Sequence, residues 1–176
     1  MNHSLSALVA LVAGLTFSVV ASAATPVTGG TFNVKIAITA ECSMGTGTNT
    51  AMDFGSAGST SATTPTETTA ASFQVKCTNL TPYTIGLQPG NANLLGAGQM
   101  AGAINTGTKI GYQLYQDAGH ATIWGNTPGV GGNLLSATGT GSLQTYSAYG
   151  KLLASISSLN LPVDNYSDTV AITVYY

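Results

Sequence analysis

Positive charge is scarce in this chain of 176 residues, which contains no arginine and only 4 basic residues, all of them lysines. With 6 acidic residues, the formal net charge is −2. Proteins that bind nucleic acids need clustered Lys and Arg side chains to displace counterions from the phosphates. The composition therefore excludes nucleic acid as a partner. The surface must be built mostly from Gly, Ala, Ser, Thr and Asn, which suits a secreted β-protein that packs against copies of itself.

Cysteine and histidine are also sparse. The chain contains only Cys42 and Cys77, and His120 is the one histidine beyond the N-terminal region. In an exported chain an isolated pair of cysteines is most simply a disulfide, although a metal site or a reactive thiol are the alternatives. With one histidine and no cysteine near it, we expect neither a metal nor another cofactor. A disulfide would close a loop of about 35 residues and stabilise the fold by about 3–4 kcal/mol on the chain-entropy estimate.

The only long apolar run lies at the N-terminus, from Leu5 to Val20, and Ala21-Ser22-Ala23 follows it. An apolar run followed by a small-x-small sequence is typical of a secretory signal peptide and its cleavage site. The run is short and is soon followed by polar residues, which argues against a membrane anchor. We therefore predict a signal peptide at residues 1–23, export of the chain, and no insertion of the mature protein into a membrane.

Directly behind the predicted signal peptide, apolar residues alternate with polar or small ones from Thr31 to Ala40. This period of two predicts a strand with one apolar face. Such a strand either folds onto its own core or fills the core of another molecule, and the pattern alone leaves both possibilities open. We divide the mature chain into an N-terminal extension, residues 24–40, and one domain, residues 41–176. The apolar face of the extension consists of Phe32, Val34, Ile36 and Ile38.

The domain contains further short alternating segments between turns rich in Gly, Pro and Asn. No segment has helical periodicity, so the pattern predicts an all-β antiparallel sandwich of about seven or eight strands. Turns or loops are expected at 88–91, 93–108, 117–119, 126–141 and 162–165. Strands are expected at 52–55, 71–77, 83–87 and 110–114, a short extended piece at 123–125, two short strands within 143–153, and a final strand whose shared face is Val170, Ile172, Val174 and Tyr176.

Several segments resemble, in the same order, those of the spore coat protein U domain family, which includes subunits of archaic, Csu-type chaperone–usher pili. Each match is loose by itself, and their order along the whole mature chain gives the resemblance its specificity. The segments are Thr28–Cys42, Met52-Asp-Phe-Gly55, Phe73-Gln-Val-Lys-Cys77, Ile110–Asp117 with Trp124-Gly125, Tyr149-Gly150 and Tyr166–Tyr175. In this comparison Asp164 stands where a glycine is expected ahead of the Tyr-x-Asp sequence.

The resemblance implies an incomplete immunoglobulin-like sandwich that lacks its last strand and is completed by donor-strand exchange. A periplasmic chaperone would fill the gap first, and the N-terminal strand of the next subunit would replace it at an outer-membrane usher. The product would be a homopolymeric pilus on the cell surface that supports attachment and biofilm formation. On this view the extension holds the donor strand, and Val170, Ile172, Val174 and Tyr176 form the edge that the chaperone pairs with. A final strand at the end of the chain would leave that edge uncovered, which makes it an aggregation site unless a partner pairs with it.

Two other classes of function could fit parts of this sequence. A secreted carbohydrate-binding sandwich would stack sugars on Trp124 and on some of the 8 tyrosines, but a lone tryptophan near a strand is more often part of the core. A hydrolase would need a carboxylate pair, and the candidates all lie next to turns or strand starts, where aspartate is common. Together with a His120 that has no nucleophile near it in sequence, this argues that the protein is not an enzyme. The candidate carboxylates are Asp53, Asp117, Asp164 and Asp168.

Overall fold

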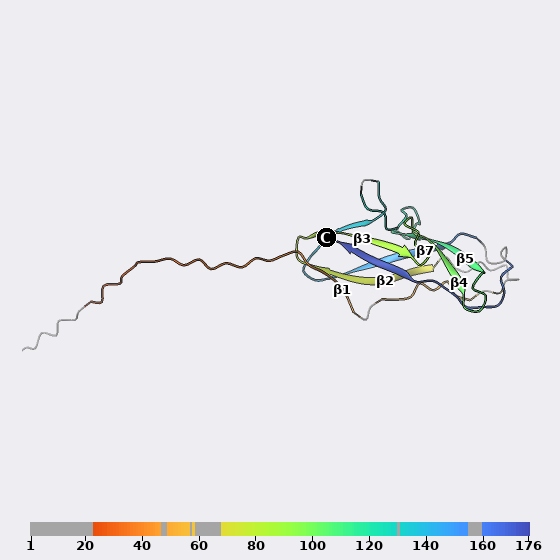
Figure 1. The fold of residues 1–176 in the computed structure, drawn as a ribbon, viewed down its shortest axis with the longest axis horizontal. Coiled ribbons are helices and arrows are strands. Elements are labelled where there is room, and N and C mark those ends of the chain that lie inside the picture. The colour runs from red at the N-terminus through yellow and green to blue at the C-terminus, as the bar shows by residue number, and fades with distance from the viewer. Residues whose placement is uncertain (1–22, 47–48, 57, 59–67, 130, 155–159) are drawn as a thin grey trace, which may run out of the picture. The chain divides into compact units, whose positions relative to one another are not determined.

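The computed structural model describes residues 23–46, 49–56, 58, 68–129, 131–154 and 160–176 (Figure 1). The predicted signal peptide lies, except for its last residue, outside this range. The chain divides into two units, residues 1–36 and residues 37–176, and each is described by itself. Within the described residues no helix is long and apolar enough to cross a membrane.

The described part of the second unit is built from strands and contains no helix. Short segments of alternating apolar and polar residues, closed by Gly and Asn turns, favour strands over helices here. The strands are β1 (Cys42–Met44), β2 (Thr68–Cys77), β3 (Pro82–Pro89), β4 (Ala97–Gly102), β5 (Lys109–Tyr115), β6 (Leu135–Thr138), β7 (Leu143–Leu152), β8 (Tyr166–Ser167) and β9 (Val170–Tyr175).

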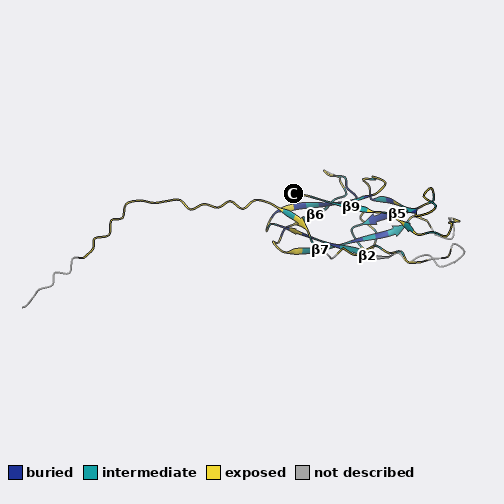
Figure 2. Cartoon of the chain, turned by 60° about the horizontal axis from the view of Figure 1, so that its bottom comes forward, coloured by how far each residue is buried: buried dark blue, intermediate teal, exposed yellow. Residues whose placement is uncertain are grey.

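These strands form two antiparallel sheets. One has the order β1-β2-β7-β5-β4-β8, and the other has the order β6-β3-β9. Figure 2 shows β2 and β7 in one layer and β6 and β9 in the other. The predicted antiparallel β-sandwich is therefore confirmed.

The core lies between the two sheets and receives side chains from both. Trp124 lies at its centre, is completely buried, and packs against Phe73 with ring centroids 5.8 Å apart. Its indole N–H donates to the Ile85 carbonyl at 2.9 Å, so the one polar atom of this ring is satisfied. The buried apolar cluster consists of Phe73, Val75, Cys77, Tyr83, Ile85, Leu87, Tyr112, Leu114, Trp124 and Ala148.

Two of the predicted loops contain strands. Residues 93–108 include β4, whose sequence Ala-Gly-Gln-Met-Ala-Gly has no apolar alternation. Its small residues have a packing reason, because a Cβ placed on Gly98 would lie 2.0 Å from the Tyr112 ring of the neighbouring strand. Residues 126–141 include β6, which pairs with β3. Both strands therefore depend on pairing with a neighbouring strand, β5 for β4 and β3 for β6.

Two other boundaries differ from the prediction. The two short strands expected within 143–153 are one strand, β7, which passes through Tyr149-Gly150 because it pairs with β2 and β5 at once. The strand expected at 52–55 is absent, and these residues have no regular structure. The predicted strands at 71–77, 83–87 and 110–114 are confirmed as β2, β3 and β5, with longer bounds.

Candidate functional site

Strand β9 is an edge of the three-stranded sheet. It pairs with β3 from Thr84↔Tyr175 to Pro89↔Val170, and no other described strand pairs with it. Unpaired N–H and C=O groups along an edge form a template for another strand. The side chains that turn from β9 toward the core are Val170, Ile172 and Val174, which are half-buried.

Tyr176 differs from the other three residues predicted for this face. It follows the last residue of β9 and is 64% exposed. Its neighbour Tyr175 is also exposed and donates its hydroxyl to the Asn126 side chain at 3.0 Å. The inward face of the edge strand therefore ends at Val174.

A hollow of about 440 Å³ lies beside this face of β9. It is lined by Val170 and Ile172 of β9 and by Met52 and Phe54 of the segment 49–54. Further lining comes from core residues of both sheets, so the hollow opens onto the interior of the sandwich. We call this hollow the groove, and we call residues 49–54 the wall segment. The core residues that line the groove are Phe73, Leu87, Tyr112, Leu114 and Ala148.

The wall segment is attached to β2 mainly at one point. The Thr50 N–H donates to the Ser72 carbonyl at 3.0 Å, and the Ser72 N–H donates to the Thr50 hydroxyl at 2.7 Å. Beyond Thr50 it is held by packing of the half-buried Met52 and Phe54. The Phe54 ring lies 6.3 Å from the Tyr112 ring, and Met52 covers Gly150, where a Cβ would lie 2.2 Å from its sulfur.

A carboxylate faces the groove just before β9. Asp168 lines the groove and accepts a hydrogen bond from the Tyr112 hydroxyl at 2.7 Å and another from the Thr169 N–H at 2.8 Å. Burial of the ring and this bond to Asp168 together raise the pKa of Tyr112 above its ordinary value. The Asp168 side chain thus fixes the start of β9 to β5 across the sandwich.

The other candidate carboxylates bind backbone N–H groups of turns. Asp164 accepts from the N–H groups of Ile104, Asn105 and Asn165 at 2.7–3.2 Å, which lowers its pKa. It therefore ties the loop after β4 to the turn before β8, although a glycine was expected at this position. Asp117 accepts from the N–H groups of Ala121 and Thr122, which lowers its pKa as well.

The remaining candidates give no catalytic arrangement. Asp53 accepts from the Gly55 N–H at 2.8 Å, as expected at a turn. His120 lies after the Asp117 turn, with its ring 5.0 Å from that of Tyr115. Trp124 is buried and cannot stack on a sugar. Among the described residues, no three His, Cys, Asp or Glu side chains are grouped so that they could hold a metal ion.

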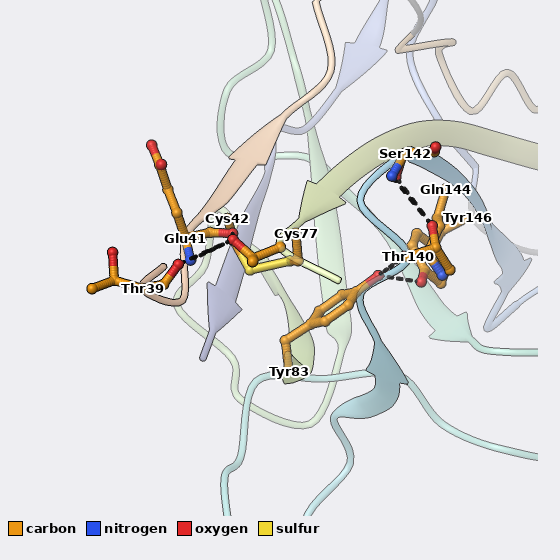
Figure 3. The surroundings of a disulfide bond; sticks show 10 residues. Thr39, Glu41, Cys42, Cys77, Tyr83, Thr140, Ser142, Gln144 and Tyr146 are labelled. Atoms are coloured by element: carbon orange, nitrogen blue, oxygen red, sulfur yellow. Dashed lines mark hydrogen bonds between the residues drawn. A yellow bond between two sulfur atoms is a disulfide. The ribbon is translucent and has the colours of Figure 1, made fainter. Parts of the chain in front are cut away.

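Cys42 and Cys77 form the predicted disulfide, between residues that are directly opposite in the β1–β2 pair (Figure 3). Their Cα atoms are 4.1 Å apart. The chain just before Cys42 is also fixed, by Thr78. Its hydroxyl accepts from the Glu41 N–H at 3.1 Å and lies 3.3 Å from the Thr39 carbonyl, to which it donates. We call the stretch Thr39–Cys42 the root of the extension.

The four apolar residues of the extension are exposed. Phe32, Val34 and Ile36 are 86–88% exposed and Ile38 is 76% exposed. The strand predicted from Thr31 to Ala40 is not formed in this chain, because residues 23–41 have no regular structure. A strand needs a neighbouring strand to accept its hydrogen bonds. The role of these residues as a donor strand stays a prediction.

Three comparisons with known proteins bear on this site. A family model described as Spore Coat Protein U domain matches residues 28–173, which is most of the chain. A comparison with curated protein sequences found no match.

Among solved structures, the chain resembles one from the CsuC–CsuE chaperone–tip adhesion subunit pre-assembly complex of archaic chaperone–usher Csu pili of Acinetobacter baumannii. The identity is 20% and the TM-score is 0.50, over 79% of this chain and 40% of that chain. This likeness shows the fold, and the present chain spans less than half of the length of its match. A second match, to a chaperone–tip adhesin complex vital for synergistic activation of CFA/I fimbriae biogenesis, has 15% identity and a TM-score of 0.35 over 60% of this chain and 33% of that one. That score supports no inference.

Proposed function

The chain belongs to the spore coat protein U domain family, and on this basis we propose that it is a structural subunit of a surface pilus assembled by the chaperone–usher route. The observation that carries the proposal is the groove beside the unpaired edge of β9. A strand added along the unpaired edge of β9 would lie beside this groove. The lining of the groove is largely apolar and comes from both sheets, so an inserted strand would complete the core.

The extension supplies a strand of the right chemistry. Its exposed residues Phe32, Val34, Ile36 and Ile38 alternate with polar or small ones, so one face can enter the groove of another copy while the other faces water. Burying four such side chains contributes about 6–12 kcal/mol before ordering costs, at about 1.5–3 kcal/mol each. Hydrogen bonds to β9 set the register. Addition of a strand to an open edge is an established recognition mode, and pilins are among its known examples.

The same edge must be covered before assembly. A periplasmic chaperone that pairs with β9 would keep the groove from aggregating, and an outer-membrane usher would exchange it for the extension of the next subunit. The route implies export through the periplasm to a fibre on the cell surface, with attachment and biofilm formation as its output. The role is structural, and no residue of the chain is assigned to catalysis.

Periplasmic expression with and without the cognate chaperone tests this proposal. We expect the subunit to accumulate as a soluble complex with the chaperone and to be degraded or aggregated without it. Adding the usher should then give surface fibres visible by electron microscopy. A stable soluble monomer in both cases would contradict the incomplete fold. Saturable glycan binding by that monomer would favour the carbohydrate-binding alternative.

A further inference from the structure

The root of the extension and the wall segment of the groove are close in sequence. Only residues 43–48 separate Cys42 from Asn49, where the wall segment begins. If the chain is a fibre subunit, as proposed above, its extension is held by one neighbour and its groove holds the strand of the other. Any tension along the fibre then enters each subunit at the root, a few residues from the wall that holds the next strand.

We propose that the Cys42–Cys77 disulfide carries this tension past the wall segment and so keeps the groove closed under load. The bond joins the first residue of β1 to the last residue of β2. A pull on the root therefore passes directly to β2. The wall segment lies inside the covalent loop between Cys42 and Cys77, so tension from the root bypasses it while the bond is intact.

Without the bond, few interactions stand between the root and the groove. Strand β1 pairs with β2 through three residues, and one further bond joins the Gly45 N–H to the Gln74 carbonyl at 2.7 Å. The next described attachment is Thr50 to Ser72, and after it come the packed side chains of Met52 and Phe54. Tension that separates β1 from β2 then reaches the wall segment directly. The strand held in the groove would lose its contact with the wall segment and keep only its contact with β9.

The strand that receives the load is well placed for it. β2 lies inside the larger sheet, between β1 and β7. It pairs with β7 from Ala71↔Ala148 to Lys76↔Leu143, so the load is shared over a long ladder. Its residues Phe73, Val75 and Cys77 are buried in the core. The disulfide thus connects the extension to one of the most firmly held strands of the domain.

Force measurements on single pili test this proposal. A pilus assembled from the natural chain is held by optical tweezers at a constant force below that which extends it, and a reductant is then added. The 25 residues between Cys42 and Thr68, where β2 begins, can lengthen each subunit by up to about 90 Å, at up to about 3.6 Å per residue. We expect such lengthening after reduction, together with earlier breakage. Alkylation and mass spectrometry then establish that both thiols were freed.

Two comparisons make the outcome decisive. Thr78→Val removes the hydroxyl at the root and leaves the disulfide, so its pili should keep their length under the same force. Cys42→Ala with Cys77→Ala should lengthen without reductant, and if this variant fails to fold, the reductant experiment decides alone. Freed and alkylated thiols with unchanged length and lifetime would overturn the proposal. Failure of the natural chain to form any pilus would instead overturn the proposed function and this inference with it.

Discussion

Strand β9 and the extension have the same alternation of apolar residues, but these residues contact the core in β9 and are exposed in the extension. In β9 the alternate residues Val170, Ile172 and Val174 pack against the core, because β3 pairs with the strand. In the extension, the alternate residues from Phe32 to Ile38 are exposed. Alternation therefore specifies that a segment has an apolar face, but it does not specify which molecule covers that face. Damage to β9 should therefore remove the folded subunit itself, whereas damage to the extension should remove only its assembly with other copies.

Deleting residues 171–176 should have the largest effect. It removes Ile172 and Val174 from the core and leaves β3 paired only with β6, so we expect loss of the subunit itself. Co-purification with a tagged chaperone from periplasmic extracts measures this. Deleting only the exposed Tyr176 is the matched control and should leave the yield unchanged. Full yield of the longer deletion in complex with the chaperone would show that β9 is not the edge that the chaperone binds.

Ile36→Asp should abolish assembly and spare the subunit. The carboxylate would enter the groove of a neighbour without a partner, at a cost of several kcal/mol, while the variant's own core is untouched. Chaperone-bound monomer should accumulate normally, and heat-sensitive, detergent-resistant oligomers should be absent on gels. Lys35→Asp, on the opposite face of the same strand, should still assemble, and Ile36→Val should cost only about 0.5–1.5 kcal/mol. If Ile36→Asp instead prevents accumulation of the monomer, the segment belongs to the subunit's own core.

Asp168→Ala should have a moderate effect on the domain. The substitution leaves the Tyr112 hydroxyl without its charged acceptor, and a hydrogen bond to a charged group contributes about 1.5–3 kcal/mol. We expect a lower melting temperature of the assembled fibres. Asp168→Asn retains a neutral acceptor and should lose less. An unchanged melting temperature for Asp168→Ala would mean that this bond does not hold the start of β9.

The pH dependence of Asp164 should be the smallest effect, and it concerns the domain alone. Backbone N–H groups lower its pKa below the value near 3.9 that aspartate has in an unfolded chain. Its contribution to stability is therefore present above about pH 4 and is lost as the pH falls through the lowered pKa. Thermal melting from neutral to acidic pH should show this loss, and Asp164→Asn should melt lower at neutral pH with a shallower acid dependence. An equally steep acid dependence in the variant would assign the effect to other carboxylates.

Elements with clear alternation were predictable. The strands β2, β3, β5 and β9 each place apolar residues at every second position, and their predictions are confirmed. β4 and β6 were not predictable in this way. In β4 the ring of Tyr112, on the neighbouring strand, leaves no room for a side chain at Gly98, and β6 forms by pairing with β3. Alternation in the sequence shows which face of a strand is apolar. The need for a small residue is set by a side chain on the neighbouring strand, which the alternation does not identify.

The site was predictable in the same uneven manner. The disulfide followed from an isolated pair of cysteines in a chain with a predicted signal peptide. The role of the last strand as an open edge came from the family resemblance and stays a prediction. The sequence has no signal for the bond from Tyr112 to Asp168, which joins residues far apart in the chain. Met52 and Phe54 belong to a short motif of the sequence, but their place beside the groove depends on how the segment packs over β5 and β7.

Trp124 can serve as an intrinsic fluorescence probe of the core. It is the only tryptophan in the chain, it is completely dry, and its ring touches Phe73, which also lines the groove. Tryptophan fluorescence depends on the polarity around the indole, so one unlabelled signal comes from the centre of the sandwich. The proposed exchange of a chaperone strand for the extension of a neighbour would take place one side chain away. Its kinetics can therefore be followed by fluorescence in the natural protein, without a dye or an added residue.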